Sequence, residues 1–360
     1  MRVVLSGYYG FGNLGDEALL DVTVAQLRTR FPYVEIDVLS AQPHETVNRL
    51  QVEATSRWDA RAVRASVRRA DVLLSGGGGL LQNATSLRSL LYYVGIVHQA
   101  VHLKRRAMIF AQSIGPLDPL GRVVVREGCR GVARATVRDA RSAKLLQSLL
   151  PAVAVEQTAD PVFLYDAPDD EFDLEREGLG ARSQPFAVLS IRRIAALNDA
   201  VALLARAADR LAAQGVAVAF LPLGGVPDAE AATSVIRKCT SAPMLLPEMS
   251  LPRAAAVLAR AHVVIGMRLH ALILAARYGV PFLAVPYDPK VTALCEDLTY
   301  PLPALWTAGE PIPSAAQVDA LVDRLLEERA SLQAHLLARL ENVRMAAARN
   351  FDIAGELLRE

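Results

Sequence analysis

The segment from 264 to 272 places an arginine and a histidine at the start of a helix. An apolar strand over His262–Ile265 runs directly into a helical pattern over Ala271–Tyr278. Positive side chains at a helix N-terminus oppose the helix dipole, so Arg268 and His270 are favourable there only when an anion lies between them and the dipole. We therefore predict an anion site here. The alternative is that Arg268 reaches solvent and His270 is an ordinary, partly buried histidine.

Two glycine-rich segments follow strands in the first half of the chain. Four glycines lie within residues 7–17 and four more are consecutive within residues 75–83. Glycine lets the backbone approach a ligand closely, and a run of four costs so much conformational entropy that a backbone nest for a phosphate or carboxylate would explain it. The spacing does not match the dinucleotide-binding fingerprint. The candidate substrate contacts in these segments are Asn13, Asp16, Gly76, Gly77 and Gly78.

The alternative for the first segment is a tight turn with Asp16 as the cap of the next helix. The alternative for the second segment is a plain connection between two elements of the sheet.

Other polar side chains also stand where strands are expected to end. Gln112 and Arg138 close two strands of the first half, Asp160 follows a third, and Lys290 follows a strand of the second half. The fork of Arg138 suits a carboxylate, or else Arg138 and Asp139 belong to a structural ion-pair network. Asp160 suits a cationic side chain or a sugar hydroxyl. Lys290 suits a phosphate, or else it is a solvated lysine at a helix start.

Alternating strands and helices must position these residues. Short apolar runs rich in Val, Ile and Leu alternate with helical patterns such as Asp16–Arg30 and Ser86–Lys104. Such an alternation is typical of a parallel sheet covered on both faces. The predicted strands are 3–6, 34–39, 72–75, 108–112, 136–139 and 153–158 in the first half, and 186–191, 216–221, 244–246, 263–266 and 282–285 in the second.

The pattern predicts an α/β protein with two Rossmann-like, doubly wound domains that face a cleft. The first domain covers residues 1–165 and the second covers 186–313, joined by a polar linker over 166–185. Residues 314–360 form a C-terminal helical region. Ligands of such sheets bind outside the carboxyl ends of the strands, where the candidate residues lie.

Composition excludes several classes of protein. The 360 residues carry a net charge of +1 and are 52% hydrophobic, which is not the basic excess of a nucleic-acid-binding protein. Three scattered cysteines give neither a disulfide framework nor a zinc site, and we expect no metal. No apolar run reaches the roughly 18 residues of a transmembrane helix. We therefore expect a soluble, cytoplasmic protein, with its oligomeric state left open.

Seven segments occur in an order that resembles the polysaccharide pyruvyl transferase family, in particular the bacterial enzymes that modify cell-wall polysaccharide. Each segment is a weak signal alone, but the ordered set is specific and covers most of the chain. The segments are GYYGFGNLGDE (7–17), SGGGGLLQ (75–82), QSIGP (112–116), VRD (137–139), ADPVF (159–163), GMRLH (266–270) and YDPKV (287–291).

The resemblance implies a glycosyltransferase-B-like fold and a reaction that moves pyruvate from phosphoenolpyruvate to a sugar as a ketal. It implies functional roles for Arg268 and His270, and it extends to Arg138 and Lys290. The implied acceptor is a saccharide such as N-acetylmannosamine in a cell-wall polymer that anchors surface-layer proteins, as a lipid-linked precursor at the inner membrane face. The implied donor is itself the substrate, so no further cofactor is expected.

For this reaction His270 is our candidate acid, because histidine transfers protons near neutral pH. Asp16, Asp139 or Asp160 could activate the sugar hydroxyl, and the sequence does not choose among them. One alternative is a nucleotide-sugar-dependent glycosyltransferase of the same fold, whose diphosphate the same helix start would bind equally well. Another is a non-catalytic polysaccharide-binding protein, which would not need several cations at one site.

Overall fold

The computed structural model of the chain describes residues 1–84, 86–166, 184–194 and 197–359. The chain divides into two compact units: unit 1 comprises Met1–Tyr165 and Asn342–Glu360, and unit 2 comprises Asp166–Glu341. Each unit contains one sheet, and the strands pair in parallel throughout the described residues. The two parallel α/β sheets agree with the sequence prediction. Most of the predicted linker, residues 167–183, lies outside the described residues.

Unit 1 is built on a seven-stranded sheet with the order β3-β2-β1-β4-β5-β6-β7. Its strands are β1 (Arg2–Ser6), β2 (Glu35–Ser40), β3 (Glu53–Ser56), β4 (Val72–Gly76), β5 (Arg106–Gln112), β6 (Arg134–Val137) and β7 (Val155–Gln157). Its helices are α1 (Leu14–Arg30), α2 (Pro43–Leu50), α3 (Ala60–Arg69), α4 (Leu87–His102), α5 (Pro119–Gly128), α6 (Ala140–Leu149) and the short 3-10 helix η1 (Pro161–Leu164).

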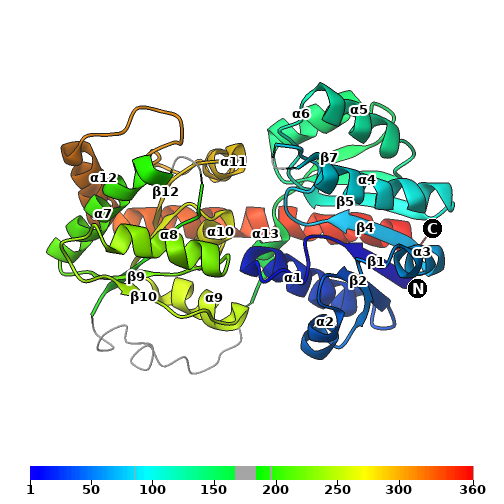
Figure 1. The fold of residues 1–360 in the computed structure, drawn as a ribbon, viewed down its shortest axis with the longest axis horizontal. Helices are drawn as coiled ribbons and strands as arrows, with labels where there is room; N and C mark the ends of the chain where they lie inside the picture. Colours follow the sequence, from blue (N-terminus) through cyan, green and yellow to red (C-terminus); the bar gives the residue numbers. More distant parts are fainter. Residues whose placement is uncertain (85, 167–183, 195–196, 360) are drawn as a thin grey trace. The chain divides into compact units, whose positions relative to one another are not determined.

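Helices cover both faces of this sheet (Figure 1). Successive strand residues point to opposite faces, and β5 shows the consequence. Ile109 belongs to an apolar cluster with α3, α4, α5 and α6, whereas the next residue, Phe110, packs on Phe351 with ring centroids 5.2 Å apart. Helices α3, α4, α5 and α6 therefore lie on one face of the sheet, and the end of α13 (Arg329–Arg359) lies on the other face.

Unit 2 is built on a five-stranded sheet with the order β10-β9-β8-β11-β12. Its strands are β8 (Phe186–Ser190), β9 (Ala217–Phe220), β10 (Met244–Leu245), β11 (Val263–Gly266) and β12 (Phe282–Ala284). Its helices are α7 (Leu197–Ala213), α8 (Val226–Ile236), α9 (Leu251–Arg260), α10 (Leu269–Arg277), α11 (Pro289–Asp297) and α12 (Ala315–Glu327). One apolar cluster joins β8, β9 and β11 to α7, α8 and α12.

The predicted strands are all present, with ends that differ by a residue or two. The sequence pattern missed β3, because Glu53–Ser56 is a short, polar edge strand without an apolar run. It also extended one strand through Asp139, whereas β6 ends at Val137 and Asp139 caps α6.

The C-terminal helices predicted for 314–360 are present as α12 and α13, and α13 contributes to both units. Residues up to Glu341 belong to unit 2, and the rest of α13 belongs to unit 1. The reason is the burial of apolar side chains near the end of α13, where Phe351 and Ala354 are fully covered. The helices in the described part of the chain include none with the length and apolar character needed to cross a membrane.

Candidate functional site

In unit 2, Arg268 lies between the end of β11 and the start of α10. Its Nε donates to one carboxylate oxygen of Asp228 at 2.7 Å and its Nη2 donates to the other at 2.6 Å. The side chain of Asp228 is 1% exposed and that of Arg268 is 14% exposed. Arg268 is thus neither a solvent-exposed side chain nor an isolated cation, because a buried carboxylate holds it in one orientation.

The loop before α8 is shaped around this pair. The backbone N–H of Gly224 donates to Asp228 at 2.9 Å. A Cβ placed on Gly224 would lie only 2.0 Å from Nη2 of Arg268, so glycine alone leaves room for the guanidinium. Since Asp228 occupies Nε and Nη2, Nη1 is the nitrogen through which Arg268 can bind a further anion. The sequence analysis missed Asp228, which follows the strand-end glycines Gly224 and Gly225 by only a few residues.

Three neighbouring strands of unit 2 bring further cations to the same edge of the sheet. β8, β11 and β12 are adjacent, and they are followed by Arg192, by Arg268 with His270, and by Lys290 respectively. His270 lies in the first turn of α10, half-buried, with its Nε2 atom out of contact with solvent. Four basic side chains therefore follow the carboxyl ends of adjacent parallel strands, and the sequence analysis had named three of them as candidates.

Lys290 and Arg192 differ in how firmly they are held. The Lys290 ammonium lies 3.6 Å from Asp288, which also caps α11 by accepting from the Lys290 backbone at 3.1 Å. Arg192 donates to the Tyr287 hydroxyl at 2.7 Å and lies 5.0 Å from the centre of that ring. Lys290, with 23% of its side chain exposed, is accessible to a phosphate.

In unit 1, Arg138 is enclosed more completely. Its Nη1 pairs with Asp160, and its Nη2 and Nε donate to the Ser113 hydroxyl at 2.9 and 3.3 Å. The side chains of Arg138 and Asp160 are 5% and 4% exposed. Asp139 is not the partner, because it caps α6 through the backbone and hydroxyl of Ser142 at 2.7 Å each. This geometry favours the ion-pair network over a carboxylate clamp.

The glycine run of unit 1 is packed tightly against its neighbours. Gly77 and Gly78 both have φ of +79°, a conformation that favours glycine. The Gly77 N–H donates to the Phe110 carbonyl at 3.0 Å, and the Tyr9 hydroxyl donates to the Gly76 carbonyl at 2.8 Å. A Cβ on Gly76 would lie 2.1 Å from that same Phe110 carbonyl. Close packing alone thus requires Gly76, and the predicted backbone nest depends on Gly78.

The polar candidates Asn13 and Asp16, in the segment after β1, have different roles. Asn13 caps α1 by accepting from the Gly15 N–H at 3.1 Å, the role that the alternative interpretation gave to Asp16. Asp16 instead lies against the glycine run, with Oδ1 2.8 Å from the position of a Cβ on Gly78. Burial is the main cause that raises the pKa of Tyr9, with Asp16 and Glu17 adding to it, so the Tyr9 hydroxyl stays protonated.

Gln112 lies at an irregularity in β5. The strand register shifts between Ile109 and Gln112, and Ala111 has a positive φ of 47°. The Ala111 N–H donates to the Thr136 hydroxyl at 2.9 Å, which stabilises this strained residue. The Gln112 amide donates to the Ser75 carbonyl at 2.6 Å, and its buried Oε1 has no hydrogen-bond partner. The residue pattern alone does not indicate this bulge at the carboxyl end of the strand.

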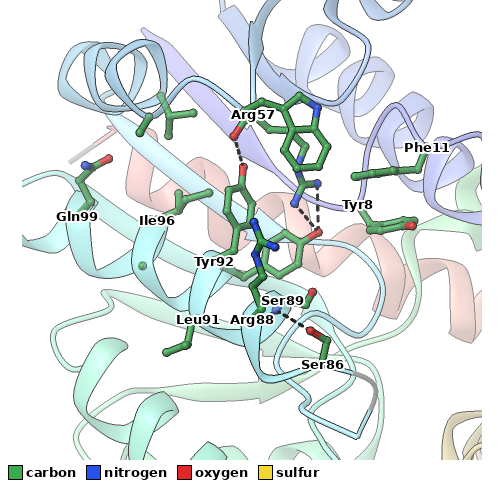
Figure 2. A pocket seen from close by; sticks show the side chains of 15 residues that line it. Tyr8, Phe11, Arg57, Ser86, Arg88, Ser89, Leu91, Tyr92, Ile96 and Gln99 are labelled. Atoms are coloured by element: carbon green, nitrogen blue, oxygen red, sulfur yellow. Dashed lines mark hydrogen bonds between the residues drawn. The ribbon is translucent and has the colours of Figure 1, made fainter.

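Within the residues that the structure describes, no group of three or more His, Cys, Asp or Glu side chains could hold a metal ion. Unit 1 also has a hollow with an aromatic lining (Figure 2). The sequence analysis missed it, although aromatic residues directly after β1 and β3 were a visible signal.

Comparisons with known proteins agree with the sequence motifs. A family model described as polysaccharide pyruvyl transferase matches residues 13–289. That range includes Asp16, Arg138, Arg268 and His270, and it ends one residue before Lys290. The comparison with curated proteins found no match.

Solved structures of glycosyltransferase-B enzymes and epimerases share the fold. Anabaena HepE in complex with UDP and glucose has a TM-score of 0.68 at 12% identity, and the match covers 100% of both chains. The UDP-GlcNAc 2-epimerase of Neisseria meningitidis bound to UDP-GlcNAc has a TM-score of 0.66 at 10% identity, again covering 100% of both chains. Phytolacca americana UGT2 has a TM-score of 0.62 at 12% identity, covering 99% of each chain. At these identities the likeness shows the fold alone.

Proposed function

Because the chain belongs to the polysaccharide pyruvyl transferase family, we propose that it transfers pyruvate from phosphoenolpyruvate to a sugar of a cell-wall or surface polysaccharide, forming a ketal and releasing phosphate. The observation that carries this proposal is the family match over residues 13–289, which spans the sheets of both units. The cations at the edge of the unit 2 sheet support an anionic donor.

We assign the donor to this edge of unit 2. Phosphoenolpyruvate carries a carboxylate and a phosphate only a few ångströms apart, so it requires several cations at one place. Asp228 orients Arg268 so that Nη1 can bind one anionic group, and Lys290 provides a point charge for the other. The first turn of α10 adds the partial positive charge of a helix N-terminus.

His270 is assigned as the acid. A proton delivered to the methylene carbon of phosphoenolpyruvate makes the central carbon cationic, and a sugar hydroxyl then attacks that carbon. Phosphate leaves with its bonding electrons, and a second hydroxyl closes the ring. A base takes up each hydroxyl proton as the oxygen attacks; one of these protons finally replaces the proton that His270 gave to the methyl group, and the other leaves on phosphate. The position of His270 next to Arg268 suits it to this transfer.

We assign the acceptor to unit 1 and favour Asp16 as the base. Asp139 is occupied by the N-terminus of α6, and Asp160 pairs with Arg138 and accepts from the Val162 N–H at 2.9 Å. Asp16 lies beside Gly78 at the carboxyl edge of the sheet, where an acceptor hydroxyl would arrive. The further assignments are an N-acetylmannosamine residue as acceptor, a lipid-linked precursor, and a cytoplasmic protein that works at the inner membrane face.

The test is incubation of the protein with phosphoenolpyruvate and a panel of saccharides, including N-acetylmannosaminides, followed by mass spectrometry for a pyruvyl adduct and by measurement of phosphate release. A pyruvyl ketal on one sugar with equal release of phosphate is expected. The fold neighbours were solved with UDP or UDP-sugars, so UDP-sugars are tested in parallel. Glycosyl transfer from a UDP-sugar without any pyruvyl adduct would replace the proposal by the glycosyltransferase alternative.

A further inference from the structure

The carboxyl edge of the unit 1 sheet carries a hollow of about 700 Å³ beside the turn that follows β1. Its lining (Figure 2) includes Tyr8 and Phe11 after β1, Arg57 and Trp58 after β3, and residues from Ser86 to Gln99, along most of the length of α4. Ligands of doubly wound sheets bind at this edge. The volume is also in the ordinary range of small-molecule sites.

A buried arginine organises the aromatic wall of this hollow. The Arg57 guanidinium carbon lies 4.8 Å from the ring centre of Phe11, 5.4 Å from that of Trp58 and 4.3 Å from that of Tyr92. The whole residue is only 8% exposed, and cation–π attraction is strongest when the cation is desolvated. The three rings therefore hold fixed positions around one cation.

Hydrogen bonds fix the arginine in turn. Its Nη1 donates to the Gly7 carbonyl at 3.2 Å and to the Tyr93 hydroxyl at 3.3 Å. Burial raises the pKa of Tyr93 to about 12, so this hydroxyl stays protonated. In the described part of the chain no carboxylate forms a salt bridge with Arg57. The guanidinium instead interacts with the aromatic rings and with the Gly7 carbonyl.

Exposed aromatic side chains make the hollow suitable for a ligand. Trp58 is 68% exposed and Tyr8 is 39% exposed, and Tyr8 stacks on Phe11 with centroids 4.1 Å apart. An exposed patch of aromatic side chains that the protein holds in fixed positions often marks a binding site. Polar side chains also line the hollow, supplied by Ser86, Arg88, Ser89 and Gln99 along α4 (Figure 2).

We propose that this hollow binds a pyranose ring of the acceptor saccharide. A pyranose has one face of C–H groups, which stacks on an aromatic ring, and an edge of hydroxyls, which needs donors and acceptors. The wall of Trp58 and Tyr8 matches the face, and the polar groups of α4 match the edge. An alkyl chain would make no hydrogen bond with these polar side chains. The inference rests on the proposed function only in naming the saccharide as the acceptor.

Tryptophan fluorescence tests the binding without any turnover. The chain has two tryptophans, and the other, Trp306, is 5% exposed with its indole N–H bonded to the Glu310 carbonyl at 3.0 Å. Quenching by acrylamide therefore reports mainly on Trp58. Methyl glycosides of N-acetylmannosamine, glucose and galactose are the probes. At least one should protect Trp58 saturably at millimolar concentration, in the wild type and in Trp306→Phe, and the signal should vanish in Trp58→Phe.

Two fluorescence results would overturn the inference. One is that none of the methyl glycosides protects Trp58 at any concentration up to solubility. The other is that octyl glucoside protects it and methyl glucoside does not, which would assign the hollow to an alkyl chain.

Kinetics separates this inference from the proposed function. Trp58→Ala should raise the KM for the saccharide about three- to tenfold and leave the KM for phosphoenolpyruvate unchanged, because a stacking contact is lost only with the acceptor. Tyr33→Ala removes an aromatic side chain of the same unit that is 92% exposed and outside the hollow, so it is the control. An unchanged saccharide KM in Trp58→Ala of an active enzyme overturns the inference. Saccharide protection of Trp58 in a protein without pyruvyl transfer supports the hollow and refutes the proposed function.

Discussion

Each unit places one arginine at the carboxyl edge of its sheet and pairs it with an aspartate, but the two pairs differ in what they leave open. In unit 1 the Arg138–Asp160 pair is buried on both sides, and Ser113 takes two more nitrogens of the guanidinium. In unit 2 Asp228 takes Nε and Nη2 of Arg268 side by side, and the arginine keeps some exposure. The first arginine is enclosed, and the second has Nη1 outside its pair with Asp228, two residues before His270 in the sequence.

The difference shows why an arginine at a strand end is not by itself a ligand-binding residue. Breaking a buried pair leaves an uncompensated charge, which costs far more than the pair itself contributes. The main role of Arg138 is therefore to stabilise the fold of unit 1. A bidentate carboxylate instead orients Arg268 before any ligand arrives, which lowers the cost of binding.

The largest effect that would sharpen this comparison is expected at His270 in unit 2. His270→Gln should lower turnover by roughly 10²–10⁴, the usual contribution of a positioned acid, with donor affinity largely kept. The alkaline limb of the pH–rate profile should also disappear, because an acid must be protonated to act. Steady-state kinetics across pH measures both. Near-normal turnover with an intact alkaline limb would assign the acid to another group and weaken the contrast between the two units.

The next effect concerns the stability of unit 1. Arg138→Met should lower the free energy of unfolding by about 3–5 kcal/mol, because Asp160 remains buried without a counter-charge. Denaturant unfolding measures this loss. The double variant Arg138→Met with Asp160→Asn should recover part of it, since the uncompensated charge is gone. A fully stable Arg138→Met that has lost donor affinity would restore the clamp interpretation and make the two arginines alike.

Sequence reasoning reached the strands because apolar runs are local signals, and strand-end motifs placed the candidate residues near strand ends. Arg268, His270 and Lys290 do follow adjacent strands of one sheet, as expected from β11 and β12. Sequence reasoning suggested a cationic side chain as a partner for Asp160 but did not identify Arg138, 22 residues away, and it missed Asp228, which lies 40 residues from Arg268. Such pairs depend on tertiary packing. The aromatic hollow was missed for the same reason, since Arg57 unites three separate segments.

A smaller effect should separate Arg268 from Arg138. Arg268→Gln should weaken phosphoenolpyruvate binding about 10- to 150-fold, the loss of one charge-assisted contact of about 1.5–3 kcal/mol. Calorimetric titration measures the affinity, and thermal unfolding should show a smaller loss of stability than Arg138→Met. The control is Arg193→Gln, which removes one exposed arginine paired with Glu230 in the same unit. Equal affinity for the donor in wild type and Arg268→Gln would remove Arg268 from the donor site.

The smallest effect is expected at Lys290, because its ammonium is partly solvated and lies 3.6 Å from Asp288. A charge that keeps some of its water gains less from a phosphate than an oriented arginine does, so Lys290→Met should weaken donor binding by about 1 kcal/mol, or roughly fivefold. The chain has four lysines, and Lys238, which is exposed between α8 and β10, provides the control at the amino edge of the same sheet. Lys238→Met removes the same charge and should leave affinity unchanged. A comparable loss in both variants would attribute the effect to net charge, and a loss in Lys290→Met larger than that in Arg268→Gln would make the lysine, not the oriented arginine, the main anchor of the donor.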